Sequence, residues 1–336
     1  MDPGCPVLER FLDDKKCFGM EPNCTFENSY SFDRIKCQKK SKWPQARNDE
    51  RIQKKTFWEQ GDFGAAMPRM TSMEVICKSK SDEDSHLECS DHLRICKAKN
   101  IFFDFGNFTA KTRYRNDVIN EGQVGGRCQF FNKELLTARA DEKSYLQSWG
   151  YELEHFESYD DFRMDKTHCD VIFEKPTIVI KLDAAVNMYH HFCDFVNLYL
   201  SQHINGSFSQ DVEIFWWDTF SGGFVDDYFG DTWKAFTVHR PHELINYQRK
   251  KVCFKNALLP LLARQRLGIY YNMPLIDGCQ GSGLFHAFSL HLIHRLKIVQ
   301  NGPILGKIRI TILQRNSSTR KIENIDEVSN LILNFF

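Results

Sequence analysis

Apolar positions in the second half of the chain follow two periods, one typical of strands and one typical of helices. Residues 177–182 (TIVIKL) form a short run rich in β-branched and aliphatic side chains, which predicts a strand. The run leads through Asp183 into a stretch whose apolar positions are spaced as on one face of a helix: Met188, Phe192, Phe195, Val196 and Tyr199. These residues therefore predict a strand–loop–helix unit.

The same alternation continues toward the C-terminal end of the sequence. Strands are predicted at 211–217, 251–258 and 307–313, and a further helix is predicted at 285–298. A final helix carries an apolar stripe of Ile325, Val328, Leu331, Ile332 and Phe335. Strands that alternate with helices indicate βαβ units and a mostly parallel sheet. Because a βα unit normally returns to the next strand, we expect this sheet to need a strand beyond the last helix.

The first half of the chain is organised differently. Residues 1–60 are polar and punctuated by cysteines, and residues 38–55 (QKKSKWPQARNDERIQKK) are so strongly charged that they predict an exposed linker or loop. Residues 61–165 mix short helical patterns with further cysteines. We therefore expect a cysteine-rich N-terminal segment with its linker (1–60), a disulfide-bearing α/β domain (61–306) and the start of another βα unit (307–336).

Composition excludes several classes of protein. The 336 residues are 42% hydrophobic and 13% aromatic, which is enough for a packed core. The 44 basic and 44 acidic residues balance, so no basic excess indicates a nucleic-acid partner. No stretch of the sequence approaches the ~18 consecutive apolar residues of a membrane span.

Cysteine usage points to an oxidising compartment. The sequence holds 12 cysteines, an even number, and eight of them fall within the first 128 residues. Such a density predicts a disulfide framework. The alternative is a zinc protein, but zinc sites usually contain paired C-x-x-C motifs and none occurs in this sequence. The cysteines are Cys5, Cys17, Cys24, Cys37, Cys77, Cys89, Cys96, Cys128, Cys169, Cys193, Cys253 and Cys279.

Four N-x-[ST] triplets, at Asn23, Asn107, Asn205 and Asn316, are candidate N-glycosylation sites and agree with passage through the secretory pathway. The first twenty residues nevertheless contain no apolar run of the ~7–15 residues that a secretory signal needs. We therefore expect that Met1 is not the start of the native precursor.

Several long motifs, in order along the chain, resemble one glycosyltransferase family. The motifs are FWEQGDFG (57–64), LECSDHLRICKAKNIFFDF (87–105), GGRC (125–128), LQSWGYEL (146–153), the stretch CDVIFEKPTIVIKLDAAVNMYHHFCDFVNLYLSQHINGSF that begins at Cys169, VCFKNALLPLLARQRLGIYYNMPLIDGC (252–279), GLFHAFSLHLIHRL (283–296) and KIRITILQR (307–315). The resemblance that they carry covers roughly residues 50 to 334. The chain thereby resembles the EGF domain-specific O-linked N-acetylglucosamine transferases, which belong to family 61 of the glycosyltransferases.

The resemblance implies a fold, a reaction and a location. The implied fold is the N-terminal Rossmann-like half of a two-domain, GT-B-like glycosyltransferase. The implied reaction is the inverting transfer of N-acetylglucosamine from UDP-GlcNAc to Ser or Thr of folded EGF-like domains in secreted or membrane proteins. The implied compartment is the lumen of the endoplasmic reticulum, and the implied partners are the EGF-like domains and the UDP-GlcNAc donor.

The sequence also departs from the family's pattern. The family has a signal peptide, a C-terminal His-Gly-Ala-Gly-Leu motif near the nucleotide site and a KDEL-like retrieval tail, none of which is in these 336 residues. Val238-His239-Arg240 stands where the family has an acidic Asp-Tyr-Asp that supports activity. A divalent metal is compatible with the sequence but cannot be placed on it. The alternative function is that of a non-catalytic, truncated form that at most binds EGF-like domains.

The residues that follow the strand at 177–182 are the candidates for catalysis. In open α/β sheets, ligands bind beyond the carboxyl ends of the strands. Asp183, His190, His191 and Asp194 lie in that region, and His190 and Asp194 are four residues apart on one helix face. An inverting transferase needs a general base for the acceptor hydroxyl, and a histidine oriented by a carboxylate suits that role. The alternative is a structural or solvated His–Asp pair.

A second set of residues is expected to contact substrate. Asn187 shares the stripe of the candidate histidines, and three cations after the strand at 307–313 suit pyrophosphate: Arg315, Arg320 and Lys321. Arg264 and Arg266 are weaker candidates of the same kind. Trp149 is a candidate for stacking on the sugar or holding the acceptor, although tryptophan is more often buried in a core.

Overall fold

The structure is a computed structural model that describes residues 16–38, 48–112, 118–141, 143, 146–184, 187–218, 229–264, 278–302, 304–306, 309–312, 314 and 321–335. The chain forms two compact units, Met1–Lys297 and Ile298–Phe336. The first unit is a mixed α/β structure that contains the sheet and the candidate catalytic residues. The second unit contains a single described helix.

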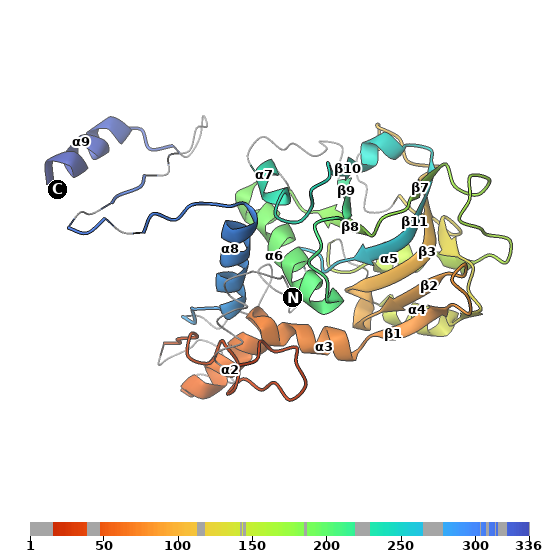
Figure 1. Cartoon of the computed structure of the whole chain (residues 1–336), viewed down its shortest axis with the longest axis horizontal. Coiled ribbons are helices and arrows are strands. Elements are labelled where there is room, and N and C mark those ends of the chain that lie inside the picture. The colour runs from red at the N-terminus through yellow and green to blue at the C-terminus, as the bar shows by residue number, and fades with distance from the viewer. Residues whose placement is uncertain are drawn as a thin grey trace. The chain divides into compact units, whose positions relative to one another are not determined.

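One central sheet runs through the first unit, with strands in the order β10-β9-β8-β11-β3-β2-β1-β5 (Figure 1). In addition, β4 pairs with β3 and β6, and β7 pairs with β11. The strands are β1 (Glu74–Lys78), β2 (His86–Cys89), β3 (Cys96–Asp104), β4 (Val124–Gly126), β5 (Phe130–Phe131), β6 (Phe156–Ser158), β7 (Val171–Phe173), β8 (Thr177–Leu182), β9 (Glu213–Asp218), β10 (His242–Glu243) and β11 (Lys251–Leu259).

The parallel half of the sheet is built from the predicted strand–helix units. β8, helix α6 (Met188–Asn205) and β9 form a βαβ unit, and β10 continues in parallel on the far side of β9. β11 lies parallel to β8 on its other side. The predicted strands at 177–182, 211–217 and 251–258 are therefore confirmed, as is the helix predicted before residue 298, which is α8 (Gly283–Arg295).

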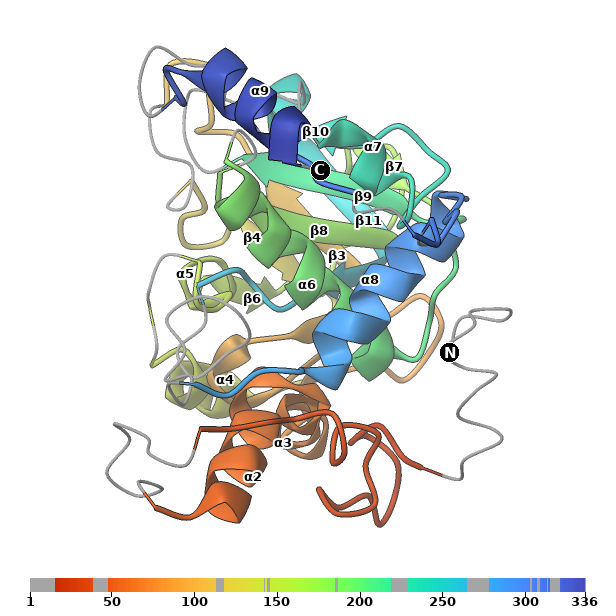
Figure 2. The same cartoon turned by 90° about the vertical axis from the view of Figure 1, so that its left-hand side faces the viewer.

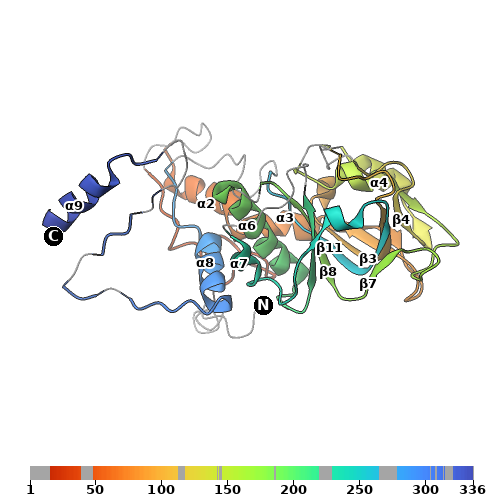
Figure 3. The same ribbon diagram turned by 90° about the horizontal axis from the view of Figure 1, so that it is seen from above.

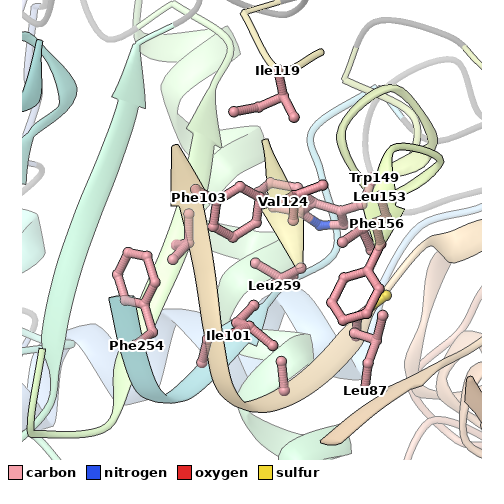
Figure 4. Packing of buried hydrophobic residues seen from close by; sticks show 14 of the residues in the cluster. Leu87, Ile101, Phe103, Ile119, Val124, Trp149, Leu153, Phe156, Phe254 and Leu259 are labelled. Atoms are coloured by element: carbon pink, nitrogen blue, oxygen red, sulfur yellow. The ribbon is translucent and has the colours of Figure 1, made fainter. Parts of the chain in front are cut away.

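Both faces of the parallel strands are covered, which explains why their sequences are almost continuously apolar. Along β8, Ile178 and Ile180 belong to a core shared with α6 and α8, whereas Val179 belongs to the core on the opposite face. β9 alternates in the same way, with Trp216 in the first core and Trp217 in the second. Figures 2 and 3 show α6 and α8 along one side of the sheet, and Figure 4 shows part of the second core.

The other half of the sheet is antiparallel, so the expectation of a mostly parallel sheet is wrong. β3 pairs with β11 from Asp104 opposite Lys251 to Cys96 opposite Leu259. β2 and β1 follow as antiparallel neighbours, and β5 closes the edge. The sequence of β3 (CKAKNIFFD) alternates lysines with small apolar residues and pairs with a strand far along the chain. A local pattern cannot reveal such a long-range pairing.

Helix α2 (Glu50–Gly61) starts inside the stretch 38–55, where a loop was predicted. Asp49 caps this helix, because its side chain accepts the backbone N–H of Ile52 at 3.1 Å. Trp58 is buried on the inner face of the helix, in a small core shared with the N-terminal segment. The charged residues that suggested a loop therefore lie on the outer face of a helix. The prediction of a loop is wrong from residue 50 onward.

The loop after α2 fixes the start of α8. Asp62 is buried, and its carboxylate accepts the backbone N–H groups of Gly283 and Leu284, each at 2.8 Å. A carboxylate is favoured at a helix N-terminus, where it pairs with otherwise unsatisfied donors. Burial nevertheless raises the pKa of Asp62 above its ordinary value. The FWEQGDFG motif thus has a structural role, since it ties α2 to α8.

Short helices connect the remaining elements, and one of them forms a buried ion pair with the sheet. They are the 3₁₀ segments η2 (Phe63–Ala65), η3 (Asp91–Leu93) and η4 (Leu244–Tyr247) and the helices α3 (Ala66–Thr71), α4 (Lys133–Arg139), α5 (Gly150–Leu153) and α7 (Gly230–Trp233). The Nζ of Lys181 on β8 lies 2.9 Å from the Oε2 of Glu152 on α5, and both side chains are fully buried. This pair fixes α5 beneath β8.

Ten cysteines in the described part of the chain form five disulfides, which agrees with a disulfide framework rather than a zinc protein. The pairs are Cys17–Cys24, Cys37–Cys279, Cys77–Cys128, Cys89–Cys96 and Cys169–Cys253. The Cys37–Cys279 bond joins positions 242 residues apart, so it ties the N-terminal segment to the residues before α8. Cys193 is buried and forms no disulfide.

The second unit contains helix α9 (Ile325–Phe335), which confirms the helix predicted at the end of the sequence. Residues 309–312, the described part of the strand predicted at 307–313, form no strand. Within the ranges that the structure describes, no helix has the length and apolar character needed to cross a membrane.

Candidate active site

The connections of the sheet place a reversal of strand order at β8. From β8 the chain leads to β9 on one side, whereas β11 lies on the other side of β8, so the strand order reverses at this point. Ligands in open α/β sheets bind at such a reversal, beyond the carboxyl ends of the strands. The residues that follow β8 and β11 at this edge include Asp183 and Arg264.

Asp183 is the centre of a cluster of charged side chains at this edge. Its Oδ1 accepts two hydrogen bonds from Arg264, from Nε at 2.9 Å and from the terminal Nη2 at 2.6 Å. Its Oδ2 lies 2.7 Å from Nδ1 of His190. The Asp183 side chain is 0% exposed, that of Arg264 is 31% exposed and that of His190 is 26% exposed. The buried carboxylate therefore orients two side chains that reach the surface.

A second His–carboxylate pair lies behind the first. Nδ1 of His191 lies 3.3 Å from Oδ2 of Asp194, and both side chains are buried. The indole N–H of Trp233 donates to Nε2 of His191 at 3.2 Å. Because an indole nitrogen is a donor only, Nε2 must accept, and the proton of the neutral imidazole is on Nδ1, facing Asp194.

Asp194 connects the two pairs. Its carboxylate accepts the backbone N–H of Asp183, with both oxygens at 3.3 Å. Burial raises the pKa of Asp194 well above its ordinary value, and the nearby charge of Asp183 raises it further. Asp194 therefore positions the loop that carries Asp183, instead of orienting His190 as its spacing on the helix suggested.

The first turn of α6 presents the exposed surface of the site. Asn187 caps the helix, since its side chain accepts the backbone N–H of Tyr189 at 3.0 Å. Asn187, Met188 and Tyr189 are exposed, although the sequence pattern placed Met188 on the apolar face of the helix. These side chains border His190 on the surface and form a mixed polar and apolar rim.

Cys193 lies one turn of α6 beyond Tyr189 and is part of the buried wall of the site. Its thiol donates to the backbone carbonyl of Tyr189 at 3.0 Å. Burial raises the pKa of this thiol, and the carboxylates of Asp194 and Asp183 raise it further. Cys193 is therefore a protonated, packed side chain and not a nucleophile.

Trp149 lies in the core and not on the surface of the site. It is fully buried, and its indole N–H donates to the backbone carbonyl of Pro260 at 2.9 Å (Figure 4 shows the ring in its core). The Nζ of Lys181 lies 4.8 Å from the centre of its ring. Trp149 thus holds the segment between β11 and Arg264, so its influence on the site is positional.

The cations predicted to bind pyrophosphate are not part of the described site. Arg315 and Arg320 lie outside the described residues, as does Arg266. Lys321 is exposed in the second unit. Arg264, which the sequence ranked below them, is the cation that the fold brings to the candidate catalytic residues. Its partner Asp183 lies 81 residues away along the chain, so no local spacing pointed to the pair.

The candidate glycosylation sites are on the surface where the structure describes them. Asn23 and Asn107 are exposed, and Asn205 is half-buried at the last position of α6. Asn316 lies outside the described residues.

Val238-His239-Arg240 lines a separate cavity of about 710 Å³ together with Lys234 and Asp231. Nε2 of His239 lies 2.6 Å from Oδ1 of Asp211, which also accepts from Nζ of Lys175 at 2.6 Å. Asp231 is paired with Lys234. The ionisable residues of the described lining are therefore mostly basic, and its one carboxylate is already paired, so these residues do not favour a divalent cation.

Together these features define a disulfide-linked α/β protein with an acid–base cluster at the carboxyl edge of its sheet, an arrangement typical of enzymes with open sheets. No family model matches the chain. The chain is, however, homologous to curated proteins named EGF domain-specific O-linked N-acetylglucosamine transferase, and the resemblance drawn from the motifs is confirmed. These relatives are glycosyltransferases by name.

The similarity extends over nearly the whole chain. The relative from Bos taurus is 43% identical over 332 residues, which are 98% of this chain and 62% of the relative. The relative from Gallus gallus is 46% identical over 343 residues, again 98% of this chain and 62% of the relative. The relative from Drosophila melanogaster is 40% identical over 320 residues, which are 93% of this chain and 60% of the relative. The chain thus spans somewhat less than two thirds of the length of the relatives it matches.

Proposed function

We propose that this chain forms the acceptor-binding and base-bearing part of an inverting transferase. The enzyme moves N-acetylglucosamine from UDP-GlcNAc to a Ser or Thr hydroxyl of a folded EGF-like domain. The observation that carries the proposal is the cluster of Asp183, His190 and Arg264 at the strand-order reversal, in a chain homologous to transferases of that name. A hydroxyl acceptor needs a base at that edge, and the cluster offers one.

His190 is the general base in this proposal. Among the four candidates, the side chains of Asp183, His191 and Asp194 are buried, whereas His190 is 26% exposed. With its Nδ1–H donated to Asp183, the neutral imidazole carries its lone pair on Nε2. Nε2 takes the proton as the acceptor oxygen attacks the anomeric carbon and the bond from that carbon to UDP breaks. Asp183 then stabilises the imidazolium that forms.

Arg264 pairs with the buried carboxylate of Asp183. An isolated buried carboxylate costs several kcal/mol, and a paired guanidinium offsets that cost. The two hydrogen bonds from Arg264 to the same oxygen also fix the direction of Oδ2, which receives the His190 proton. Arg264 is thus a positioning residue, and it acts through Asp183.

The donor is held by a second Rossmann-like domain in this proposal, which gives the complete enzyme a GT-B-like architecture. The relatives extend beyond the part that this chain matches, which supports such a second domain. The enzyme works in the lumen of the endoplasmic reticulum, and the five disulfides support an oxidising compartment. The exposed Met188 and Tyr189 beside His190 are the acceptor contact.

A transfer assay tests the donor and the acceptor. The chain is assayed alone and after extension by the C-terminal segment of one of the relatives, with labelled UDP-GlcNAc and a folded EGF-like domain. We expect the extended chain to add one N-acetylglucosamine to a Ser or Thr, seen as the corresponding mass increase. The same domain with its disulfides reduced is the control and should accept less. Binding of the EGF-like domain without transfer by either chain would instead favour the non-catalytic alternative.

A further inference from the structure

Helix α7 packs beside the candidate active site through one tryptophan. Figures 1 and 3 show α7 next to α6. The ring of Trp233 is buried, and its centre lies 5.6 Å from that of His191 and 4.8 Å from that of Phe195. A buried indole N–H usually finds an acceptor, and here the acceptor is Nε2 of His191 at 3.2 Å. Trp233 is therefore bonded to the residue that follows His190 in the chain.

A network of hydrogen bonds leads from Trp233 to the loop after β8. Trp233 donates to His191, and Nδ1 of His191 donates to Oδ2 of Asp194 at 3.3 Å. The carboxylate of Asp194 accepts the backbone N–H of Asp183, with both oxygens at 3.3 Å. Trp233, His191, Asp194 and Asp183 are 2%, 0%, 1% and 4% exposed. Because solvent hardly reaches these residues, water does not replace a hydrogen bond that the network loses.

The network ends at the carboxylate that orients His190. Oδ2 of Asp183 lies 2.7 Å from Nδ1 of His190. Successive residues of an α-helix point about 100° apart, so His190 reaches the surface while His191 lies in the core. The influence of Trp233 on His190 therefore passes through Asp194 and the position of the Asp183 loop.

We propose that Trp233 is a positioning residue for His190. Its N–H keeps the imidazole of His191 in the tautomer with the proton on Nδ1, and that proton holds Asp194 in place for the backbone of Asp183. Without the indole donor the proton can move to Nε2, and the lone pair of Nδ1 then faces the Asp194 carboxylate, which repels it. The role of His190 as base rests on the proposed function, whereas the network itself does not.

Two changes at Trp233 test the inference in the full chain. Trp233→Phe keeps an aromatic ring but has no N–H. Benzothienylalanine in place of Trp233 keeps the shape of the indole and carries sulfur where the N–H was, so it guards against a loss of packing. Trp58→Phe is the matched control. Trp58 is 6% exposed in a separate core, and its Nε1 has no hydrogen-bond partner among the described residues.

Nitrogen-15 NMR of the histidine rings monitors the network without any need for activity. In the unmodified chain we expect His190 and His191 to be Nδ1–H tautomers. Both changes at Trp233 should give His191 a mixture of tautomers. They should also speed the exchange of the His190 Nδ1 proton with water about tenfold, which corresponds to ~1.4 kcal/mol. Trp58→Phe should change neither. Equal exchange of the His190 proton in the Trp233 and Trp58 variants would overturn the proposal.

The transfer kinetics of the extended chain separate this inference from the proposed function. Both changes at Trp233 should lower kcat about tenfold and leave KM for the EGF-like domain unchanged, because they leave the rim at Met188 and Tyr189 intact. Trp58→Phe should alter neither constant. A lower kcat with unaltered exchange of the His190 proton would indicate a structural role alone and overturn the proposal. If no extended chain transfers sugar, the proposed function fails, and the exchange of the His190 proton still decides whether Trp233 positions that side chain.

Discussion

Asp183 and Arg264 lie 81 residues apart in the chain, and their side chains meet at 2.6 Å beyond the carboxyl ends of β8 and β11. The pair spans the point at which the strand order reverses. The carboxylate of Asp183, which Arg264 holds in place at this reversal, also orients the imidazole of His190.

Removal of Arg264 should destabilise the fold through the carboxylate it leaves behind. Arg264→Ala leaves the buried Asp183 without its cation, which costs about 3 kcal/mol or more in the free energy of unfolding. Urea unfolding monitored by tryptophan fluorescence measures the loss. Arg264→Ala combined with Asp183→Asn should recover part of the stability, since no buried charge then remains. A double variant less stable than Arg264→Ala would contradict the assignment.

Replacement of Asp194 should change how stability depends on pH. An unfolded aspartate titrates near ~3.9, whereas burial and the charge of Asp183 raise the pKa of Asp194 in the fold well above its ordinary value. The folded state therefore binds the extra proton. The stability that this proton contributes is fully present below about pH 4 and is lost as the pH rises through the folded pKa.

Asp194→Asn has no carboxyl group to bind this proton. The loss of stability that Asp194 causes as the pH rises should therefore be absent from the variant. Its amide oxygen still offers an acceptor to the backbone N–H of Asp183. Urea midpoints from pH 4 to pH 8 compare the variant with the unmodified chain. Parallel curves for the two proteins would show that Asp194 does not titrate in this way.

Two disulfides of unequal span should contribute unequally to stability. The Cys37–Cys279 bond closes a separation of 242 residues, and the Cys17–Cys24 bond closes one of 7. On the chain-entropy model the first stabilises by about 5 kcal/mol and the second by about 2 kcal/mol. Paired Cys→Ala variants of each bond, unfolded in guanidinium, give the comparison. Equal losses would contradict the role of Cys37–Cys279 as the long-range tie.

The sequence predicted the parallel half of the fold because that half has local signals. β8 is a run of β-branched and aliphatic residues, and α6 repeats its apolar positions with the helical period, so both elements matched their predicted ranges closely. The antiparallel half was missed because β3 alternates lysines with small apolar residues and pairs with β11 across the chain. Helix α2 was missed because its outward face is almost entirely charged.

The site was predicted in position but not in detail. The strand-end rule led to Asp183 and His190, because both follow β8 directly. It did not show that Asp183, and not Asp194, orients His190, since helix spacing favours partners four residues apart and the actual partner lies in the loop. Arg264 received a low rank because only the fold brings it to Asp183.

The measurement that tests the central claim most directly is the rate of sugar transfer by a matched pair of histidine variants in the extended chain. His190→Ala removes the proposed base. His168→Ala removes a histidine that is 28% exposed and pairs with Asp165 at 2.8 Å, so it matches His190 in exposure and in partner but lies outside the site. We expect His190→Ala to reduce the initial rate by about 10²–10⁴-fold. His168→Ala should leave it unchanged. Equal rates for the two variants would contradict the assignment of His190 as the general base.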